Sequence, residues 1–154
     1  KPVCRNIYLL TAEEAQHLFL TPEPAPSRAR VQYNKVKEAD GTRQITLGAQ
    51  KVAEAPTDAD FLHAAVYNLE LPEQGGMLQI DYRGDVARLY ADGKLVADNF
   101  YYGRPFLFDL SRLPQDTRQL ELRILPLQPD MPVYFPREAD TTPGEVVLSV
   151  SRVM

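Results

Sequence analysis

The sequence predicts an all-β domain, an antiparallel β-sandwich or jelly roll with one short helix near the N-terminus. Prolines make up 13 of the 154 residues and tryptophan is absent, a composition typical of short elements joined by proline-marked turns. Apolar and polar residues alternate along short stretches that recur roughly every 8–12 residues. After Leu20, no segment of helical length shows a period of about 3.6 residues. These three observations favour a sandwich over a parallel sheet with crossover helices.

The N-terminal region is expected to form a strand, a helix and a loop. Residues 5–10 show a strand pattern, and residues 12–18 are predicted as a short helix. Thr11 and Glu14 have the spacing of a capping box, in which each side chain bonds a backbone donor of the other residue. Three prolines between residues 21 and 27 then prevent further helix, because each removes a backbone donor.

The next strands are expected to form a hairpin and a covered strand. Residues 30–36 and 43–47 flank Asp40-Gly41, and such a pair favours a tight reversal of the chain. These two segments are therefore predicted to pair. Residues 61–69 alternate in a way that predicts one strand, covered on both faces.

The strongest local signal is a second hairpin, in which residues 86–91 and 94–100 flank Asp92-Gly93. This dipeptide suits a type I′ turn, and a two-residue loop leaves little freedom of register. One face of the hairpin is expected to carry five apolar side chains: Ala87, Leu89, Ala91, Leu95 and Ala97.

The remaining strands are inferred from the same alternation of apolar and polar residues. They are expected at residues 77–82, 106–110, 119–125, 133–135 and 145–153. The sequence contains no repeat and no long internal linker. Residues 1–154 are therefore predicted to form a single domain, which is an ordinary size for one.

Charge and hydropathy exclude two classes of partner. The net charge is −4, which argues against nucleic acid because phosphate binding needs clustered Lys and Arg. No apolar run approaches the roughly 20 residues that span a bilayer. Cys4 is the only cysteine, so it cannot form an internal disulfide. The chain begins with Lys1 and shows no full signal-peptide pattern, which suggests a processed product or a piece of a longer protein.

Catalytic and cofactor signatures are absent from the sequence. It has no Gly-x-Ser-x-Gly elbow, phosphate loop, dinucleotide fingerprint or His-Glu-x-x-His motif. His17 and His63 are expected to be structural, because nothing nearby completes a dyad with either. Acid pairs such as Asp58 and Asp60 are expected to cap turns. No loop has the regular acidic spacing of a calcium site, so no cofactor is predicted, although calcium remains compatible with the sequence.

The densest group of residues suited to recognition lies at the exit of the second hairpin. The candidate ligand-binding residues there are Asp98, Asn99, Tyr101, Tyr102 and Arg104. Tyrosines stack on sugar rings while the polar groups bond hydroxyls. The alternative interpretation is that Phe100 and one tyrosine fill the end of the sandwich, or that the same residues contact another domain. A second aromatic patch, residues 132–136, is expected to form a proline-bounded edge strand.

Two stretches resemble the accessory β-sandwich of β-galactosidase-like glycoside hydrolases. In that family a strand ending in Gly-Asp is followed by an Asp-Gly-Lys hairpin and then by Asp-Asn-Phe. Here these motifs are Gly84-Asp85, Asp92-Gly93-Lys94 and Asp98-Asn99-Phe100. Residues 122–135 also look like that module, so the resemblance covers about residues 78–135, with a looser match at residues 9–15.

The resemblance implies a galactose-binding-domain-like jelly roll attached to a sugar-cleaving catalytic domain. The family's catalytic glutamates lie in that other domain, so none is carried onto this chain. The expected function is a non-catalytic accessory module that stabilises or orients the catalytic domain of the parent chain, in the periplasm or outside the cell. Whether the module also contacts carbohydrate stays open. The alternative is an independent, lectin-like carbohydrate-binding module. An enzyme ranks third, because it would need two acids converging in a pocket.

Overall fold

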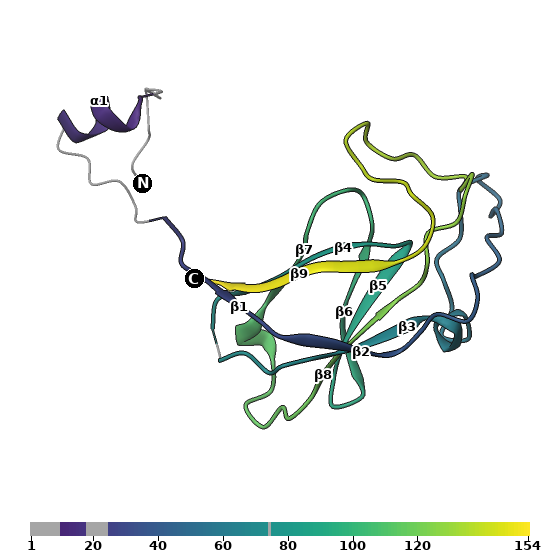
Figure 1. The fold of residues 1–154 in the computed structure, drawn as a ribbon. Helices are drawn as coiled ribbons and strands as arrows, with labels where there is room; N and C mark the ends of the chain where they lie inside the picture. Colours follow the sequence, from purple (N-terminus) through teal and green to yellow (C-terminus); the bar gives the residue numbers. More distant parts are fainter. Residues whose placement is uncertain (1–9, 18–24, 74) are drawn as a thin grey trace.

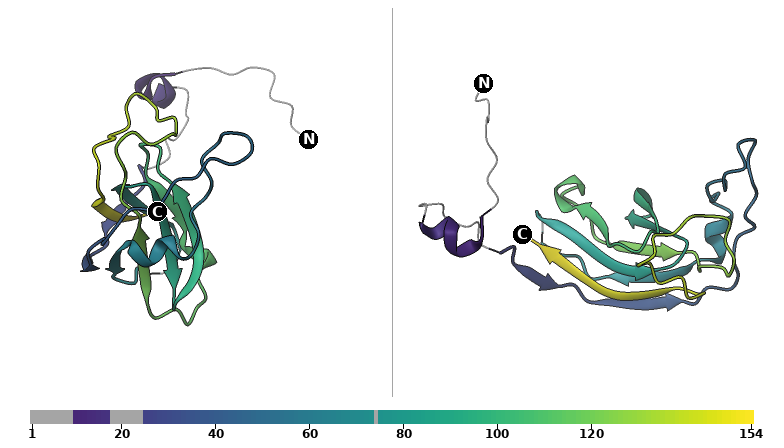
Figure 2. Two further views of the ribbon diagram at one scale, coloured as in Figure 1. Left: turned by 90° about the vertical axis from the view of Figure 1, so that its right-hand side faces the viewer. Right: turned by 90° about the horizontal axis from the view of Figure 1, so that it is seen from above.

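The structure is a β-sandwich, as the sequence predicts. The computed structural model describes residues 10–17, 25–73 and 75–154. Within these ranges nine strands form two antiparallel sheets that face each other (Figures 1 and 2). The finer resemblance to galactose-binding domains stays a prediction. Residues 5–9 of the strand expected at 5–10, Cys4 and part of the proline-rich loop lie outside the described residues.

One sheet has the strand order β1-β9-β4-β7. Its strands are β1 (Arg28–Arg30), β4 (Met77–Arg83), β7 (Phe106–Asp109) and β9 (Val146–Val153). The other sheet has the order β2-β3-β8-β5-β6. Its strands are β2 (Tyr33–Lys37), β3 (Ala65–Leu69), β5 (Val86–Ala91), β6 (Lys94–Phe100) and β8 (Leu120–Ile124). Three short helical segments complete the described elements: α1 (Ala12–His17), η1 (Asp60–His63) and η2 (Leu110–Arg112).

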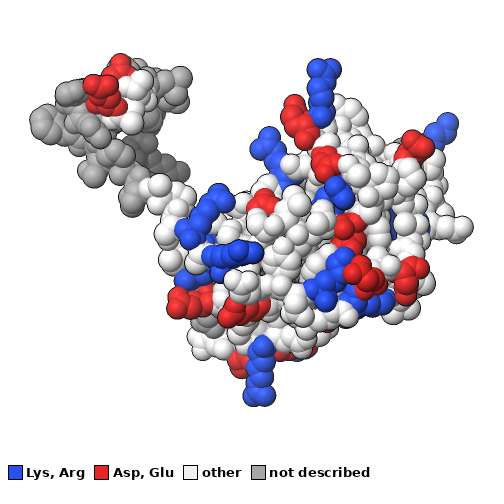
Figure 3. Space-filling view, in the orientation of Figure 1, with Lys and Arg blue, Asp and Glu red and all other residues white. Residues whose placement is uncertain are grey.

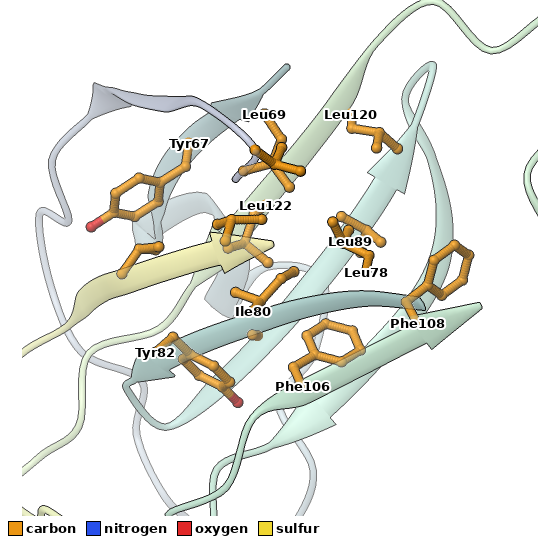
Figure 4. Close-up of a cluster of buried hydrophobic side chains, with 14 of the residues drawn as sticks. Tyr67, Leu69, Leu78, Ile80, Tyr82, Leu89, Phe106, Phe108, Leu120 and Leu122 are labelled. Carbon is orange, nitrogen blue, oxygen red and sulfur yellow. The ribbon is translucent and has the colours of Figure 1, made fainter. Parts of the chain in front are cut away.

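The core lies between the two sheets and is built by the period-two alternation of their strands. Leu78 and Ile80 of β4 meet Leu89 of β5 and Leu122 of β8, and all four side chains are fully buried. Figure 4 shows these side chains directed toward one another from opposite sheets. Burying a leucine or isoleucine of this kind contributes about 1.5–3 kcal/mol relative to leaving it exposed. The alternation therefore both defines the strands and holds the sheets together.

The hairpin of β5 and β6 is confirmed, with one correction of register. Asp92 and Gly93 have φ angles of 47° and 77°, as a type I′ turn requires. The two-residue turn places Leu95 opposite Tyr90, and Leu95 is 48% exposed. A β-bulge between Leu89 and Tyr90 then shifts the pairing, so that Ala97 lies opposite Leu89. The expectation that Leu95 shares the buried face was wrong, although Ala87, Leu89 and Ala91 do lie there.

The first predicted hairpin was wrong. β2 pairs with β3, and residues 43–47 form no strand beyond an isolated bridge between Leu47 and Ala53. The reason is a tertiary interaction, because Arg43 is drawn into the interior by Asp85. A long-range ion pair thus overrides the local turn signal at residues 40–41.

The structure also tests the predicted capping box, the start of β3 and the predicted edge strand at residues 133–135. The capping box is confirmed, since the Thr11 amide donates to Glu14 and the Glu14 amide donates to the Thr11 hydroxyl. β3 begins later than predicted, because Phe61 belongs to the helical turn η1 and not to the strand. Residues 133–135 form no strand, so the predicted edge strand there was wrong.

The surface carries no evident concentration of one charge on the face shown in Figure 3, where acidic and basic side chains lie side by side. No helix among the described residues combines the length and the apolar character needed to cross a membrane.

Gly84, between β4 and β5, leaves no room for a side chain. A Cβ there would lie 2.9 Å from the Leu125 carbonyl oxygen and closer still to Cγ2 of Ile124. We expect Gly84→Ala to lower the free energy of unfolding by about 1–3 kcal/mol, measured by urea denaturation. Gly41→Ala is the matched control, because the nearest atoms to its Cβ lie at 3.6 Å. Equal stability of the two variants would contradict the close packing of Gly84.

Candidate functional site

The exit of the β5–β6 hairpin contributes to a cleft at one end of the sandwich. The cleft has a volume of about 310 Å³. Its lining comes from the end of β6 and the two residues after it, from the 43–54 region, from the β4–β5 turn and from residues 133–135. The lining residues are Arg43, Ala53, Glu54, Asp85, Phe100, Tyr101, Tyr102, Val133, Tyr134 and Phe135.

Tyr101 forms the inner wall of this cleft. Its ring is 8% exposed and makes an edge contact with Tyr82 at a centroid distance of 5.6 Å. Its hydroxyl donates a hydrogen bond of 3.0 Å to the Asp140 carbonyl oxygen. Burial, followed by the nearby Asp140 charge, raises the pKa of Tyr101. Tyr101 is therefore held rigidly from behind, and most of its ring is not available to a ligand.

Three other aromatic rings of the cleft are open to solvent. Phe100, Tyr102 and Tyr134 are 51%, 45% and 93% exposed. Exposed apolar rings grouped around one hollow are a common sign of a binding surface. These three residues are called the aromatic rim below.

The local sequence explains why the rim is exposed. Phe100 ends β6 and Tyr102 follows just before Gly103, whose φ of 81° turns the chain. On the other side, Phe135 packs against Tyr101 at a centroid distance of 6.2 Å. Phe135 packs on the inner wall of the cleft, and the side chain of its neighbour Tyr134 is exposed to solvent.

The floor of the cleft is a buried ion pair between Arg43 and Asp85, whose side chains are only 4% and 5% exposed. Arg43 Nε donates to Asp85 Oδ2 at 2.5 Å and Nη2 donates to Oδ1 at 3.3 Å. Arg43 Nη1 donates to the Glu54 carbonyl oxygen at 2.8 Å. The Asp85 carbonyl oxygen accepts from the Tyr101 amide at 3.0 Å. The pair thus fastens the 43–54 region to the wall of the cleft.

A second set of polar contacts, among Arg83, Asp140 and Thr142, lies next to Tyr101, the inner wall of the cleft. Arg83 Nη1 lies 2.8 Å from Asp140 Oδ2, and Thr142 donates to the same carboxylate through its hydroxyl and its amide. The Thr142 bonds, followed by the Arg83 contact, lower the pKa of Asp140 to about 2. Asp140 is therefore ionised at neutral pH and available to hold Arg83. Behind Tyr101, burial and then the Asp85 charge raise the pKa of Tyr82, so its hydroxyl stays protonated.

The predicted binding residues separate into two groups. Tyr101 and Tyr102 line the cleft, whereas Asp98, Asn99 and Arg104 do not. Asp98 and Arg104 are exposed. Asn99 is half-buried and accepts the Tyr82 hydroxyl at 2.8 Å through its side chain, which is a structural contact. A binding role for any of the five stays a prediction.

Only two of the ten residues that line the cleft are among the predicted binding residues, and those not predicted include Phe100, Tyr134, Arg43 and Asp85. Tyr134 carried a usable signal, because prolines at positions 132 and 136 make a regular strand unfavourable around an aromatic residue. Phe100 was assigned to the sandwich end, and Arg43 to a strand. No local pattern marks the ion pair.

The cleft offers ring faces and hydrogen-bonding groups. Asp85 is occupied by Arg43, and the Glu54 carboxylate accepts the Thr46 hydroxyl at 2.5 Å. Elsewhere, His63 Nδ1 lies 2.8 Å from Asp40 Oδ1. In the part of the chain that the structure describes, no group of three or more His, Cys, Asp or Glu is placed to hold a metal ion. The hollow has the size and the mixed lining to accommodate a small, partly apolar ligand.

Comparison of the chain with protein-family models, with curated proteins and with solved structures returned no significant match. The resemblance to the accessory sandwich of β-galactosidase-like enzymes therefore rests on its two sequence stretches. The case for a site rests on the geometry of the cleft.

Proposed function

We propose that this chain is a non-catalytic accessory β-sandwich of a carbohydrate-cleaving enzyme and that it contacts carbohydrate through the aromatic rim. The observation that carries the proposal is the grouping of Phe100, Tyr102 and Tyr134 as exposed rings around one cleft. The stretches at residues 81–105 and 122–135 support a β-galactosidase-like parent enzyme. Its catalytic domain is then the second partner, which the sandwich stabilises or orients in the periplasm or outside the cell.

The chemistry of sugars fits this arrangement. A pyranose ring has an apolar face of C–H groups and a polar edge of hydroxyls. Stacking the face on an aromatic ring removes apolar surface from water. The hydroxyls at the edge then meet the polar atoms that converge on the cleft, such as those of Glu54 and the tyrosine hydroxyl of Tyr102. Both requirements are met by residues that line one hollow.

A glycan-array screen of the 154-residue chain, run with and without calcium, tests the proposal. We expect binding to at least one class of glycan. The double variant Tyr102→Ala/Tyr134→Ala should weaken that binding roughly tenfold or more, because two stacking rings are lost. Both side chains are exposed, so the melting temperature should change little.

The matched control is Leu107→Ala, which removes an exposed apolar side chain of β7 that does not line the cleft. This variant should bind as the unmodified chain does. Failure of the folded chain to bind any glycan would refute the proposed carbohydrate contact. Full binding by the double variant would refute the aromatic rim as its site.

A further inference from the structure

A second hollow, with a volume of about 380 Å³, borders the cleft. The residues that line it are Leu127, Gln128, Pro129, Asp130, Met131, Phe135, Thr141 and Pro143. Phe135 lines the cleft as well. A hydrogen bond also joins the two linings, since Nε2 of Gln128 donates to the carbonyl oxygen of Arg43, a cleft residue, at 2.6 Å. The cleft and the second hollow are therefore neighbours.

The sides of the second hollow are fixed by the backbone. One side comes from residues 127–131 and the other from residues 141 and 143. Leu127 and Gly144 exchange two backbone hydrogen bonds of 2.8 Å, which join the two segments. Pro129 and Pro143 restrict the backbone further, because the proline ring fixes φ. A hollow that is already formed loses little conformational entropy when it binds a ligand.

The lining of the second hollow suits a sugar ring as well as that of the cleft does. It combines apolar residues, such as Leu127, Met131 and Phe135, with polar ones, such as Gln128 and Thr141. Apolar surface can cover the C–H face of a pyranose, and polar groups can bond its hydroxyls. Ligand sites have volumes of about 300–1,000 Å³. The cleft and the second hollow each lie near the low end of that range, which favours one small unit in each.

We infer that the second hollow is a subsite for a neighbouring sugar, so that the chain binds a disaccharide or a longer glycan in preference to a single sugar. This inference rests on the proposed carbohydrate contact and adds the length of the ligand. One sugar stacks on the aromatic rim, and the next passes Phe135 and enters the second hollow. Because the two sugars are already linked, the second one binds with little further loss of translational freedom.

An NMR titration of the 154-residue chain, labelled at its methionine methyl groups, tests the inference. The probes are the methyl glycosides of glucose, galactose and mannose, and 1,3-, 1,4- and 1,6-linked disaccharides of the same sugars. The best disaccharide should bind roughly tenfold or more tightly than the best methyl glycoside. It should also shift the methyl resonance of Met131, which the methyl glycosides should not. Met77 and Met154 line neither hollow and should stay unchanged with every probe.

Met131→Ala tests the position of the second sugar, because it removes an apolar side chain from the second hollow. The variant should bind the disaccharide several-fold more weakly and should bind the methyl glycosides as before. The matched control is Met77→Ala, the same change at a residue of β4 that is 36% exposed. This control should leave the affinity for both kinds of probe unchanged. Circular dichroism checks that both variants are folded.

The outcomes distinguish the two proposals. If sugars shift the resonances of the aromatic rim and no disaccharide binds more tightly than the methyl glycosides, the second subsite is wrong while the carbohydrate contact stands. If a disaccharide binds more tightly but leaves the Met131 methyl resonance unchanged and keeps its affinity in Met131→Ala, its second sugar lies elsewhere and the inference is wrong. If no probe shifts the resonances of the aromatic rim, the proposed carbohydrate contact fails and the inference fails with it.

Discussion

Asp85→Ala is expected to lower the free energy of unfolding by about 3–5 kcal/mol, because it leaves the Arg43 guanidinium buried without a counter-charge. Both side chains are at least nine-tenths buried, so solvent does not screen the loss. For a chain of this length, each kcal/mol shifts the melting temperature by about 2–4 °C. The melting temperature should therefore fall by roughly 10 °C, as measured by circular dichroism.

Two control variants isolate the cause. Asp98→Ala removes an exposed aspartate of β6 and should change stability by no more than about 0.5 kcal/mol. The double variant Arg43→Met/Asp85→Leu removes both buried charges and should be more stable than Asp85→Ala alone. If Asp85→Ala were as stable as Asp98→Ala, the buried Arg43–Asp85 pair would not stabilise the fold beneath the cleft.

Tyr101→Ala should cost about 3–5 kcal/mol of stability, while Tyr102→Ala, one residue away, should cost about 0.5 kcal/mol or less. The difference follows from packing. The Tyr101 ring contacts Tyr82 and Phe135 in the interior, whereas the Tyr102 ring is 45% exposed. Urea denaturation of both variants measures the two costs directly.

Tyr101→Phe refines this prediction, since it keeps the ring and removes the hydroxyl that bonds the Asp140 carbonyl oxygen. It should cost about 1 kcal/mol, the usual net contribution of such a bond. A loss for Tyr102→Ala that matches the loss for Tyr101→Ala would show that the two neighbouring rings share one structural role. The aromatic rim would then lose one of its three members.

The elements that sequence reasoning found correctly are those set by local chemistry. The β5–β6 turn needs two consecutive residues with positive φ, and Asp92-Gly93 meets that need on its own. The core strands follow from strict alternation, as in β8. The bulge beside Leu89 has no comparable signal, because its residues are ordinary strand formers. The bulge places Ala97, rather than Val96, opposite Leu89.

The elements that sequence reasoning missed depend on distant partners. Arg43 and Asp85 are 42 positions apart, and their attraction places the 43–54 region against the cleft when the Asp40-Gly41 turn suggests a hairpin. The segment 98–105 contributes Tyr101 and Tyr102 to the lining of the cleft. It does not reveal Tyr134, which reaches the cleft only because residues 133–135 return to Tyr101. The site is thus a product of topology more than of any motif.

The most direct test of the carbohydrate site is an NMR titration that follows the aromatic side chains of the folded chain. The probes are the neutral methyl glycosides of glucose, galactose and mannose. We expect at least one of them to shift the ring resonances of Phe100, Tyr102 and Tyr134. Tyr33 and Tyr67, which pack against each other away from the cleft, should stay unchanged. Shifts confined to residues outside the cleft, or no shifts at millimolar ligand concentrations, would show that the aromatic rim does not bind these sugars.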